Sequence, residues 1–248
     1  MRSITISEMD PSAPELAAKW GTGVETIAFC QAENMEDEAL IAEKRRQLAP
    51  FAPLSLHAPY YELTPCAIDS MIGAVSLHRY RQAVETCVRL GVHRLIVHSG
   101  FAPQVYYPEW FVPKSISFWR SFVQELPEGF EMMLENVLEP APEPLLQVVE
   151  GVNDPHMRIC LDVGHANAYS RIPTADWICL FGRHIGHVHL HNNDGARDTH
   201  APLDRGTLDM RDTLKLLERY APEAVWCIES CDARACMAYL AKEGFLDA

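Results

Sequence analysis

The feature that most constrains this chain is a regular alternation of short β-rich runs with amphipathic segments. Each run has the length and composition of a buried strand, and each is followed by a stretch that can be helical. Such alternation indicates a parallel sheet with helical crossovers, and eight units favour closure of that sheet into a barrel. The expected strands are RSITIS, VETIAFC, LSLHAPY, RLIVHSG, FEMMLENV, RICLDVG, HIGHVHLH and AVWCIES.

The expected helices follow these strands in order, and no domain linker or internal repeat interrupts them. A chain of 248 residues has the usual size of one barrel, so residues 1–248 are predicted to form a single (β/α)8 TIM barrel of the α/β class. No GxGxxG motif follows the first strand, which argues against a dinucleotide-binding fold. The helices are expected at PELAAKW, EDEALIAEKRRQL, IDSMIGAVSLHRYRQAVETCVRLG, SISFWRSFVQEL, PEPLLQVVEGV, TADWICLFGRH, MRDTLKLLERY and DARACMAYLAKEG.

Two loops stand out by composition. Pro140–Pro144 is short and proline-rich, and we expect it to lead into a helix because proline suits the first helical turn. Phe101–Pro113 is rich in aromatic residues and proline, and we expect it to be a longer loop after the fourth strand. A loop at that position lies on the catalytic side of a barrel, where it can cover a substrate.

Charge and composition argue against several classes of partner. The formal net charge of −13 disfavours a large nucleic-acid footprint, because phosphate contacts need clustered Lys and Arg. The first residues lack an apolar h-region, and no stretch approaches the roughly 18 apolar residues that a membrane span needs. The eight scattered cysteines form no CxxC pair and are typical of reduced thiols, so we expect a cytoplasmic protein. The sequence leaves the oligomeric state open.

Side chains that can bind a metal lie in or at the end of six of the expected strands. In a parallel barrel these ends converge on one mouth. A polar group in an apolar strand is costly to bury unless it is paired or bound to a cation. One such residue alone is typical of a hydrogen-bonded core or cap position, but several at equivalent places indicate a metal site. They are His57, His98, Glu135, Asp162, His189 and Glu229.

Further ligand types follow in the loops. His165 lies three residues after Asp162, and Asp198 and His200 form a D-x-H pair after His189. An Asx-turn beside a surface histidine would look the same, so the pair gains weight only from its proximity to His189. Imidazole and carboxylate together suit Zn²⁺, Mn²⁺, Fe²⁺ or Co²⁺, whereas Mg²⁺ and Ca²⁺ favour oxygen ligands alone.

The seventh expected strand carries further histidines. Period-two alternation puts His187 and His191 on the same face as His189. We expect His187 to fill an interior layer or to orient a ligand, and we do not expect His191 to act directly.

The motifs LSLHAPY, LIVHSG, LENV, LDVGHAN, HVHLHNNDG, RDTH, DRGTLD and CIES together resemble the successive signatures of the xylose-isomerase-like barrel superfamily. This superfamily holds apurinic endonuclease IV and many sugar phosphate isomerases and epimerases. The resemblance runs from about Leu54 to Ser230, which is most of the chain. Each motif is short, but their order and spacing are specific.

The resemblance implies one to three divalent ions per chain, since all ligand positions of the trinuclear zinc site of endonuclease IV are filled. The three ligand sets are His57, His98 and Glu135; Glu135, Asp162, His189 and Glu229; and His165, Asp198 and His200. In the ketose epimerases of the superfamily, the second set holds a single metal, and its two glutamates also serve as acid and base.

The resemblance leaves two chemistries open at the same mouth. For isomerisation or epimerisation, a metal polarises a substrate carbonyl, and Glu135 and Glu229 transfer a proton through a metal-stabilised enediolate. For phosphoester hydrolysis of the endonuclease IV type, several zinc ions lower the pKa of water, and Glu135 bridges two of them. A metal-binding barrel without catalysis is a third alternative.

Charge and length favour a small substrate. Enzymes that act on abasic DNA hold a bent duplex with basic and intercalating loops, and the expected loops here contain little Lys or Arg. We therefore expect a sugar, sugar phosphate or related polyol. Arg205 stands where the resemblance expects a glycine-rich turn, so it either binds a substrate phosphate or carboxylate or pairs with Asp204 or Asp209.

Overall fold

The computed structural model describes residues 2–246 and contains a closed barrel of eight parallel strands in chain order. The last strand closes the barrel on the first, with Thr5 opposite Cys227. The predicted (β/α)8 fold is therefore confirmed, while residues 1 and 247–248 of the predicted domain lie outside the described part. The strands are β1 Ile4–Ser7, β2 Gly23–Thr26, β3 Leu54–His57, β4 Arg94–His98, β5 Glu131–Glu135, β6 Met157–Asp162, β7 Ile185–Leu190 and β8 Val225–Ile228.

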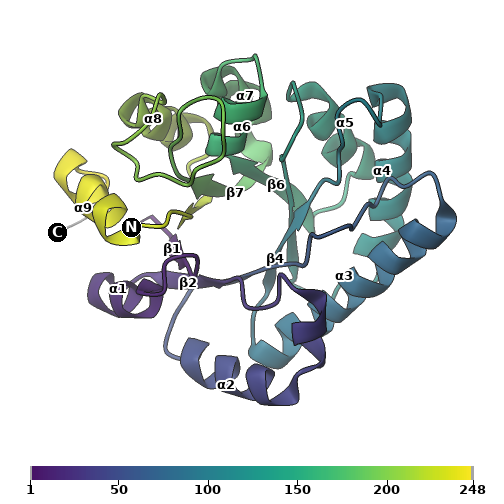
Figure 1. Ribbon diagram of the computed structural model, residues 1–248, viewed down its shortest axis with the longest axis horizontal. Coiled ribbons are helices and arrows are strands. Elements are labelled where there is room, and N and C mark those ends of the chain that lie inside the picture. The colour runs from purple at the N-terminus through teal and green to yellow at the C-terminus, as the bar shows by residue number, and fades with distance from the viewer. Residues whose placement is uncertain (1, 247–248) are drawn as a thin grey trace.

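The helices surround the strands on the outside of the barrel (Figure 1). Several begin at an aspartate whose carboxylate accepts backbone N–H groups of the first turn, as Asp37, Asp69, Asp209 and Asp232 do. The helices are α1 Ala13–Trp20, α2 Glu38–Leu48, α3 Ser70–Leu90, α4 Pro108–Val123, α5 Glu143–Val152, α6 Val163–Tyr169, α7 Thr174–Phe181, α8 Met210–Tyr220 and α9 Ala233–Glu243, with short 3-10 helices η1 Ala32–Glu36 and η2 Gly182–His184.

The loop expected over Phe101–Pro113 is wrong in its second half, because α4 already begins at Pro108. Pro108 stands in the first turn, where its missing N–H breaks no bond. Pro113 lies inside the helix, and the carbonyl of Glu109 that it leaves unpaired belongs to an exposed residue. The expected helix start after Pro140–Pro144 is confirmed by α5, which begins at Glu143.

Two boundaries after strands also differ from the prediction. The strand expected over RICLDVG ends at Asp162, whose carboxylate accepts the N–H of His165 at 2.6 Å and so starts α6, a helix that the sequence did not predict. The strand expected over VETIAFC ends at Thr26. A turn follows, in which the N–H of Cys30 donates to the carbonyl of Ile27 at 3.1 Å.

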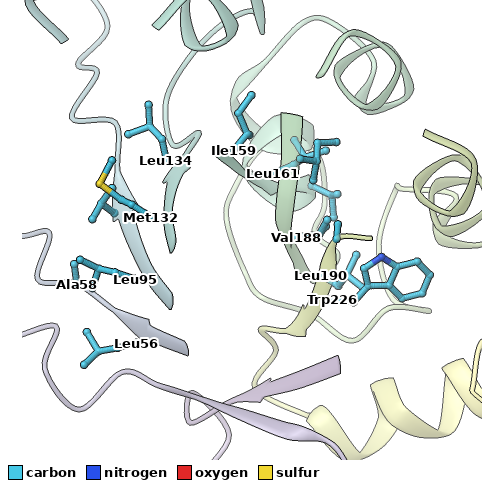
Figure 2. Close-up of a cluster of buried hydrophobic side chains, with 14 of the residues drawn as sticks. Leu56, Ala58, Leu95, Met132, Leu134, Ile159, Leu161, Val188, Leu190 and Trp226 are labelled. Atoms are coloured by element: carbon cyan, nitrogen blue, oxygen red, sulfur yellow. The ribbon is translucent and has the colours of Figure 1, made fainter. Parts of the chain in front are cut away.

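The main core lies between the strands and the helices. Alternate residues of each strand point outward into this layer, and Figure 2 shows Leu56, Leu95, Met132, Leu161 and Trp226 among them. All five are completely buried. Burial of this apolar layer fixes which residues of each strand point inward.

The inward residues divide the barrel interior into an apolar and a polar part. Ile96, Met133 and Cys160, from β4 to β6, form an apolar cluster of their own. The polar part contains the buried residues Thr5, Glu25, Ser55, His187 and Cys227. The eight cysteines are all free, and no helix among residues 2–246 has both the length and the hydropathy that crossing a membrane would require.

Candidate metal centre

The barrel brings the six polar residues expected at its strand ends to one mouth. Because all strands are parallel, their carboxyl ends lie at the same end of the barrel. Neighbouring registers set ligands side by side, with His98 opposite Glu135 and Asp162 opposite His189. The residues at this mouth are His57, His98, Glu135, Asp162, His189 and Glu229.

Glu135 lies between two groups of imidazoles. Its Oε2 is 3.3 Å from Nε2 of His57 and 3.5 Å from Nε2 of His98. Its Oε1 is 3.2 Å from Nδ1 of His189. One carboxylate therefore faces two separate sets of nitrogen ligands, as a bridging ligand would.

The second set, which we call the inner set, consists of Glu135, Asp162, His189 and Glu229. Its ligand atoms all lie within 4.8 Å of one another, and all four residues are buried. Nδ1 of His189 is at its centre, 3.1 Å from Oε2 of Glu229 and 3.7 Å from Oδ2 of Asp162. Three carboxylates and one imidazole thus converge on a volume that one cation could fill.

The three residues that were expected in loops, His165, Asp198 and His200, form an outer set, although His165 lies in α6. Oδ2 of Asp198 is 3.2 Å from Nε2 of His165 and 2.9 Å from Nε2 of His200. His165 reaches this position because α6 starts directly at the end of β6. All nine residues predicted as metal ligands are therefore brought together at the mouth, in the inner set, the outer set and the pair His57 and His98.

The loop that carries Asp198 and His200 is fixed to the barrel. Asn192 and Ala201 pair as an antiparallel bridge, and the amide of Asn192 donates to the carbonyls of Leu203 and Leu208. His200 has a φ of 45°, in the left-handed region that a residue with a Cβ adopts at a cost. This backbone conformation is held by Ser230, whose hydroxyl donates to the carbonyl of His200 at 2.9 Å.

His191 belongs to the site, although it was not expected to act. Its Nε2 is 3.1 Å from both carboxylate oxygens of Asp162, and its Nδ1 is 3.6 Å from Oδ1 of Asp198. Its ring stacks on His200 with centroids 4.1 Å apart. A Cβ on Gly164 would lie 1.9 Å from this ring, which explains the glycine in LDVGHAN. The alternation that put His191 on the face of His189 was the signal for its position.

Glu25 is a further residue that sequence reasoning missed. It lies in β2 below the mouth, is completely buried, and its Oε1 is 3.2 Å from Nε2 of His189. Its Oε2 is 3.1 Å from Nε2 of His187, in the interior layer where His187 was expected. The strand predicted here extended too far beyond Thr26, so Glu25 was expected near the start of the strand, far from the mouth.

The carboxylates of the inner set are held in their ionised form by the imidazoles around them. Burial raises the pKa of Glu135, but His189 and His98 outweigh burial and hold this pKa well below its ordinary value. Burial likewise raises the pKa of Asp162, and the imidazoles of His165 and His191 bring it well below the usual range. Both groups are therefore ready to bind a cation.

The imidazoles differ from one another in how they hold a proton. Burial lowers the pKa of His98 to about 3, although Glu135 acts in the opposite direction. Burial also lowers the pKa of His200, but Asp198 and Glu229 outweigh it and raise this pKa to about 9. His98 thus presents a free nitrogen lone pair, whereas His200 carries a proton that a metal would displace.

The chemistry of the donors fits a divalent cation. Several buried polar atoms that face the mouth have no hydrogen-bond partner among the described residues, which is costly unless something else binds them. Imidazole and carboxylate donors in this mixture suit Zn²⁺, Mn²⁺, Fe²⁺ or Co²⁺. The atoms concerned are Oε2 of Glu135, Oε2 of Glu229, Nδ1 of His191 and Oδ1 of Asp198.

A pocket of about 390 Å³ opens beside Glu229 and His57. Tyr60 forms part of its wall and stacks on His98, with ring centroids 4.6 Å apart. The lining contains polar but uncharged groups besides Glu229 and His57, and the whole lining is Met9, Ile27, Ala28, Cys30, Gln31, Asn34, His57, Tyr60, Tyr61 and Glu229.

Two predicted contributors do not line this pocket. Arg205 lies on the surface with 67% of its side chain exposed, and its Nε is 3.9 Å from Oδ1 of Asp204. This contact matches the alternative in which Arg205 pairs with a neighbouring aspartate. The remaining loop, residues 101–107, contributes no side chain to the pocket either.

Comparison with known proteins adds relatives of similar sequence. The uncharacterized protein MJ1311 of Methanocaldococcus jannaschii is 27% identical over 189 residues, which cover 72% of this chain. The matched part spans 64% of that protein's length.

Solved structures share the whole fold. The TTHB071 protein from Thermus thermophilus, soaked with ZnCl2, is 26% identical with a TM-score of 0.77, and the match covers 99% of both chains. A D-tagatose 3-epimerase-like protein is 21% identical with a TM-score of 0.81, covering 98% of this chain and 97% of that one. The family described as xylose isomerase-like TIM barrels matches residues 14–244. Since this match includes nearly the whole barrel, the chain belongs to the family of xylose isomerase-like TIM barrels.

Proposed function

We propose that this protein is a metal-dependent isomerase or epimerase of a small polyhydroxylated carbonyl compound. The observation that carries the proposal is the pair Glu135 and Glu229. Their carboxylates lie beside the same imidazole nitrogen, Nδ1 of His189, at 3.2 and 3.1 Å, and Glu229 also lines the pocket. Membership of a family whose structural relatives include proteins called epimerase-like supports this choice.

The inner set would hold the metal, which when bound would polarise a substrate carbonyl and the hydroxyl beside it. Oε2 of Glu229 is buried without a hydrogen-bond partner and faces the pocket, so it is the candidate base for the carbon next to the carbonyl. Oε2 of Glu135, equally without a partner, is the candidate group that returns a proton. Tyr60, Gln31 and Asn34 line the pocket and would orient substrate hydroxyls.

The pocket lining favours an uncharged sugar or polyol over a sugar phosphate. It contains a carboxylate and several amide and hydroxyl groups, and no Lys or Arg is among its residues. A phosphate would be expected to meet a guanidinium or an ammonium group. The role first expected for Arg205 remains a prediction that applies only to a substrate with a phosphate or carboxylate and longer than this pocket.

Replacement of Glu229 by Gln tests the proton transfer directly. Proton transfer at carbon incorporates deuterium from D₂O into the product, which NMR detects across a panel of ketoses, ketose phosphates and cyclic polyols that includes D-tagatose. We expect Glu229→Gln to abolish incorporation while substrate still binds in calorimetry. Glu131→Gln, at the opposite end of β5, is the matched control and should retain activity. Unchanged incorporation in Glu229→Gln would remove Glu229 from the mechanism.

A second candidate is a phosphoesterase that uses several zinc ions, in the manner of apurinic endonuclease IV. The outer set favours it, because one metal held by the inner set does not require His165, Asp198 and His200. Metal analysis of protein purified without chelator separates the two: about three zinc ions per chain would support the hydrolase, and one firmly held ion the isomerase. Cleavage of an abasic oligonucleotide would decide for the hydrolase.

A further inference from the structure

A carboxylate below the mouth takes no part in the proposed proton transfer. Glu25 is completely buried in β2, and the groups that contact it are a hydroxyl and two imidazoles. A buried carboxylate is costly unless its partners compensate for the lost water. Another part of the same interior is filled by Ile96, Met133 and Cys160, so the barrel does not need a charge to be filled.

The two oxygens of Glu25 face different side chains. Oε2 accepts the hydroxyl proton of Ser55 at 2.7 Å and lies 3.1 Å from Nε2 of His187. Oε1 lies 3.2 Å from Nε2 of His189. Ser55 stands directly opposite Glu25 in the register of β2 and β3, so this arrangement follows from strand pairing.

His189 therefore connects the interior to the mouth through its two nitrogens. Nε2 faces Glu25, whereas Nδ1 faces the carboxylates of Glu135, Glu229 and Asp162. An imidazole that binds a metal through one nitrogen usually donates its other N–H to a carboxylate, which fixes the tautomer and the orientation of the ring. Glu25 is the carboxylate in that position.

We infer that Glu25 is a positioning residue of the metal site: it accepts the Nε2 proton of His189 and so leaves Nδ1 of His189 free to bind the cation. Glu25 does not touch the cation or the substrate. The hydroxyl of Ser55 donates to the other oxygen of Glu25, beside Nε2 of His187, and thereby fixes the direction of the carboxylate. The inference rests on the metal site of the proposed function and does not depend on which reaction that site performs.

Metal affinity is the first readout. Zn²⁺ or Co²⁺ is titrated into the full-length, metal-free protein in competition with a chromophoric chelator. We expect Glu25→Gln, which keeps the volume and removes the charge, to weaken binding about 10- to 100-fold. Met133→Leu changes the apolar part of the same interior at nearly constant volume and should leave the affinity within about twofold of the wild type. Equal losses in both variants would overturn the inference, because packing alone would then explain the effect.

The chemical shift of the imidazole proton is the second readout. Replacement of a residue with a merely structural role would not change this shift. In zinc-loaded protein labelled with ¹⁵N-histidine, the Nε2 proton of His189 should resonate at lower field in the wild type than in Glu25→Gln. The variant His187→Gln removes the signal of the other imidazole beside Glu25, so the signal that remains there and depends on Glu25 belongs to His189. An unchanged shift in Glu25→Gln would overturn the inference.

Further outcomes keep the inference separate from its alternatives. If Glu25→Gln does not fold, Glu25→Asp keeps the charge but withdraws the oxygen by one methylene. We expect Glu25→Asp to lose metal affinity as well, and full wild-type affinity would overturn the inference.

Glu25, His187, His189 and Cys227 could also hold an ion of their own. Loss of one whole equivalent of metal, with unchanged affinity for the rest, would assign that role instead. Failure of the wild type to bind metal would defeat the proposed function itself.

Discussion

His98 and His200 stand at the same mouth but hold their protons very differently. Burial brings the pKa of His98 to about 3, whereas Asp198 and Glu229 overcome the burial of His200 and raise its pKa to about 9. The difference follows from geometry, because Nε2 of His200 is 2.9 Å from a carboxylate oxygen of Asp198. His98 is 3.5 Å from Glu135, a carboxylate that several imidazoles share.

Binding of a metal to the outer set should therefore depend on pH. His200 is protonated below a pH of about 9, and a metal must displace that proton to bind the imidazole. Burial lowers the pKa of His165, but Asp162 and Asp198 outweigh burial and raise this pKa as well, so the protons of two imidazoles compete with a metal at the outer set. We expect the affinity of the outer set to fall by between about tenfold and about a hundredfold for each pH unit below this value, since each competing proton contributes up to about tenfold. Competition titrations with Zn²⁺ between pH 6 and pH 8.5 measure the slope, and His200→Gln, which leaves the proton of His165 in place, should make the slope smaller. An affinity in the wild type that does not change over this range would contradict the expectation.

At the scale of strands and helices, the sequence predicts the site better than it predicts the segments around it. His57, His98, Glu135 and Asp162 were expected in or at the end of their strands, and each is the last residue of its strand, although every expected strand ran beyond it. Runs of apolar residues that stop at a polar one mark where a buried strand leaves the core. The start of α6 was missed, since the glycine and asparagine of VGHANAY are poor helix formers. The helix starts here because the carboxylate of Asp162 caps it. Whether an aspartate caps a helix depends on the direction of its side chain, which hydrophobic periodicity does not indicate.

Glu25 and His191 could not be assigned for a related reason. Their roles depend on which side chain of another strand faces them. Glu25 meets His189 across the barrel interior, and His191 meets Asp162 from the neighbouring strand. Alternation indicates the face of the strand on which a residue lies. It does not indicate which side chain that residue contacts or how far below the mouth of the barrel it lies. Contacts of this kind follow from barrel closure and register.

Gly164 makes a prediction at the start of α6. A Cβ here would lie 1.9 Å from Cε1 of His191, so Gly164→Ala must displace that ring from Asp162. We expect a loss of about 1–3 kcal/mol in the free energy of unfolding, together with weaker metal binding. The matched control is Gly73→Ala in α3, where nothing lies within 4 Å of the added methyl group. It should raise the stability by about 0.5–1 kcal/mol, because alanine favours a helix. Urea unfolding checks both values, and a neutral Gly164→Ala would show that the ring moves without cost.

At the scale of the whole molecule, the barrel concentrates its polar side chains at one end and one side of its interior. The mouth carries carboxylates and imidazoles, Glu25 and His187 lie in the interior below it, and Ile96, Met133 and Cys160 make another part of the interior apolar. Because of this division, the barrel is rigidly packed directly beneath a site whose polar atoms lack hydrogen-bond partners. A chain with a net charge of −13 and such a mouth suits a cation and a small polar molecule better than a polyanion.

Barrel closure itself depends on the junction between the first and the last βα units, where Asp10 connects them. Its Oδ1 accepts the N–H and the hydroxyl of Ser12 at 2.8 Å, and its Oδ2 accepts the N–H of Ala233, the first residue of α9, at 2.8 Å. Asp10 thus caps a helix more than two hundred residues away in sequence. We expect Asp10→Ala to lower the free energy of unfolding by about 1–2 kcal/mol, because buried N–H groups lose their acceptor.

This contribution should disappear in acid. Burial raises the pKa of Asp10, but the N–H groups and hydroxyl that it accepts outweigh burial and lower that pKa. A carboxylate with a lowered pKa stabilises the fold above the unfolded-state value of about 3.9, and the stabilisation is lost as the pH falls through the folded-state pKa. The stability difference between the wild type and Asp10→Ala, measured by urea unfolding, should therefore be full at pH 6 and shrink towards pH 3. Glu85→Ala, on the exposed side of α3, should stay within about 0.5 kcal/mol of the wild type throughout. A difference for Asp10→Ala that persists unchanged at pH 3 would mean that the charge of Asp10 has no role in closing the barrel.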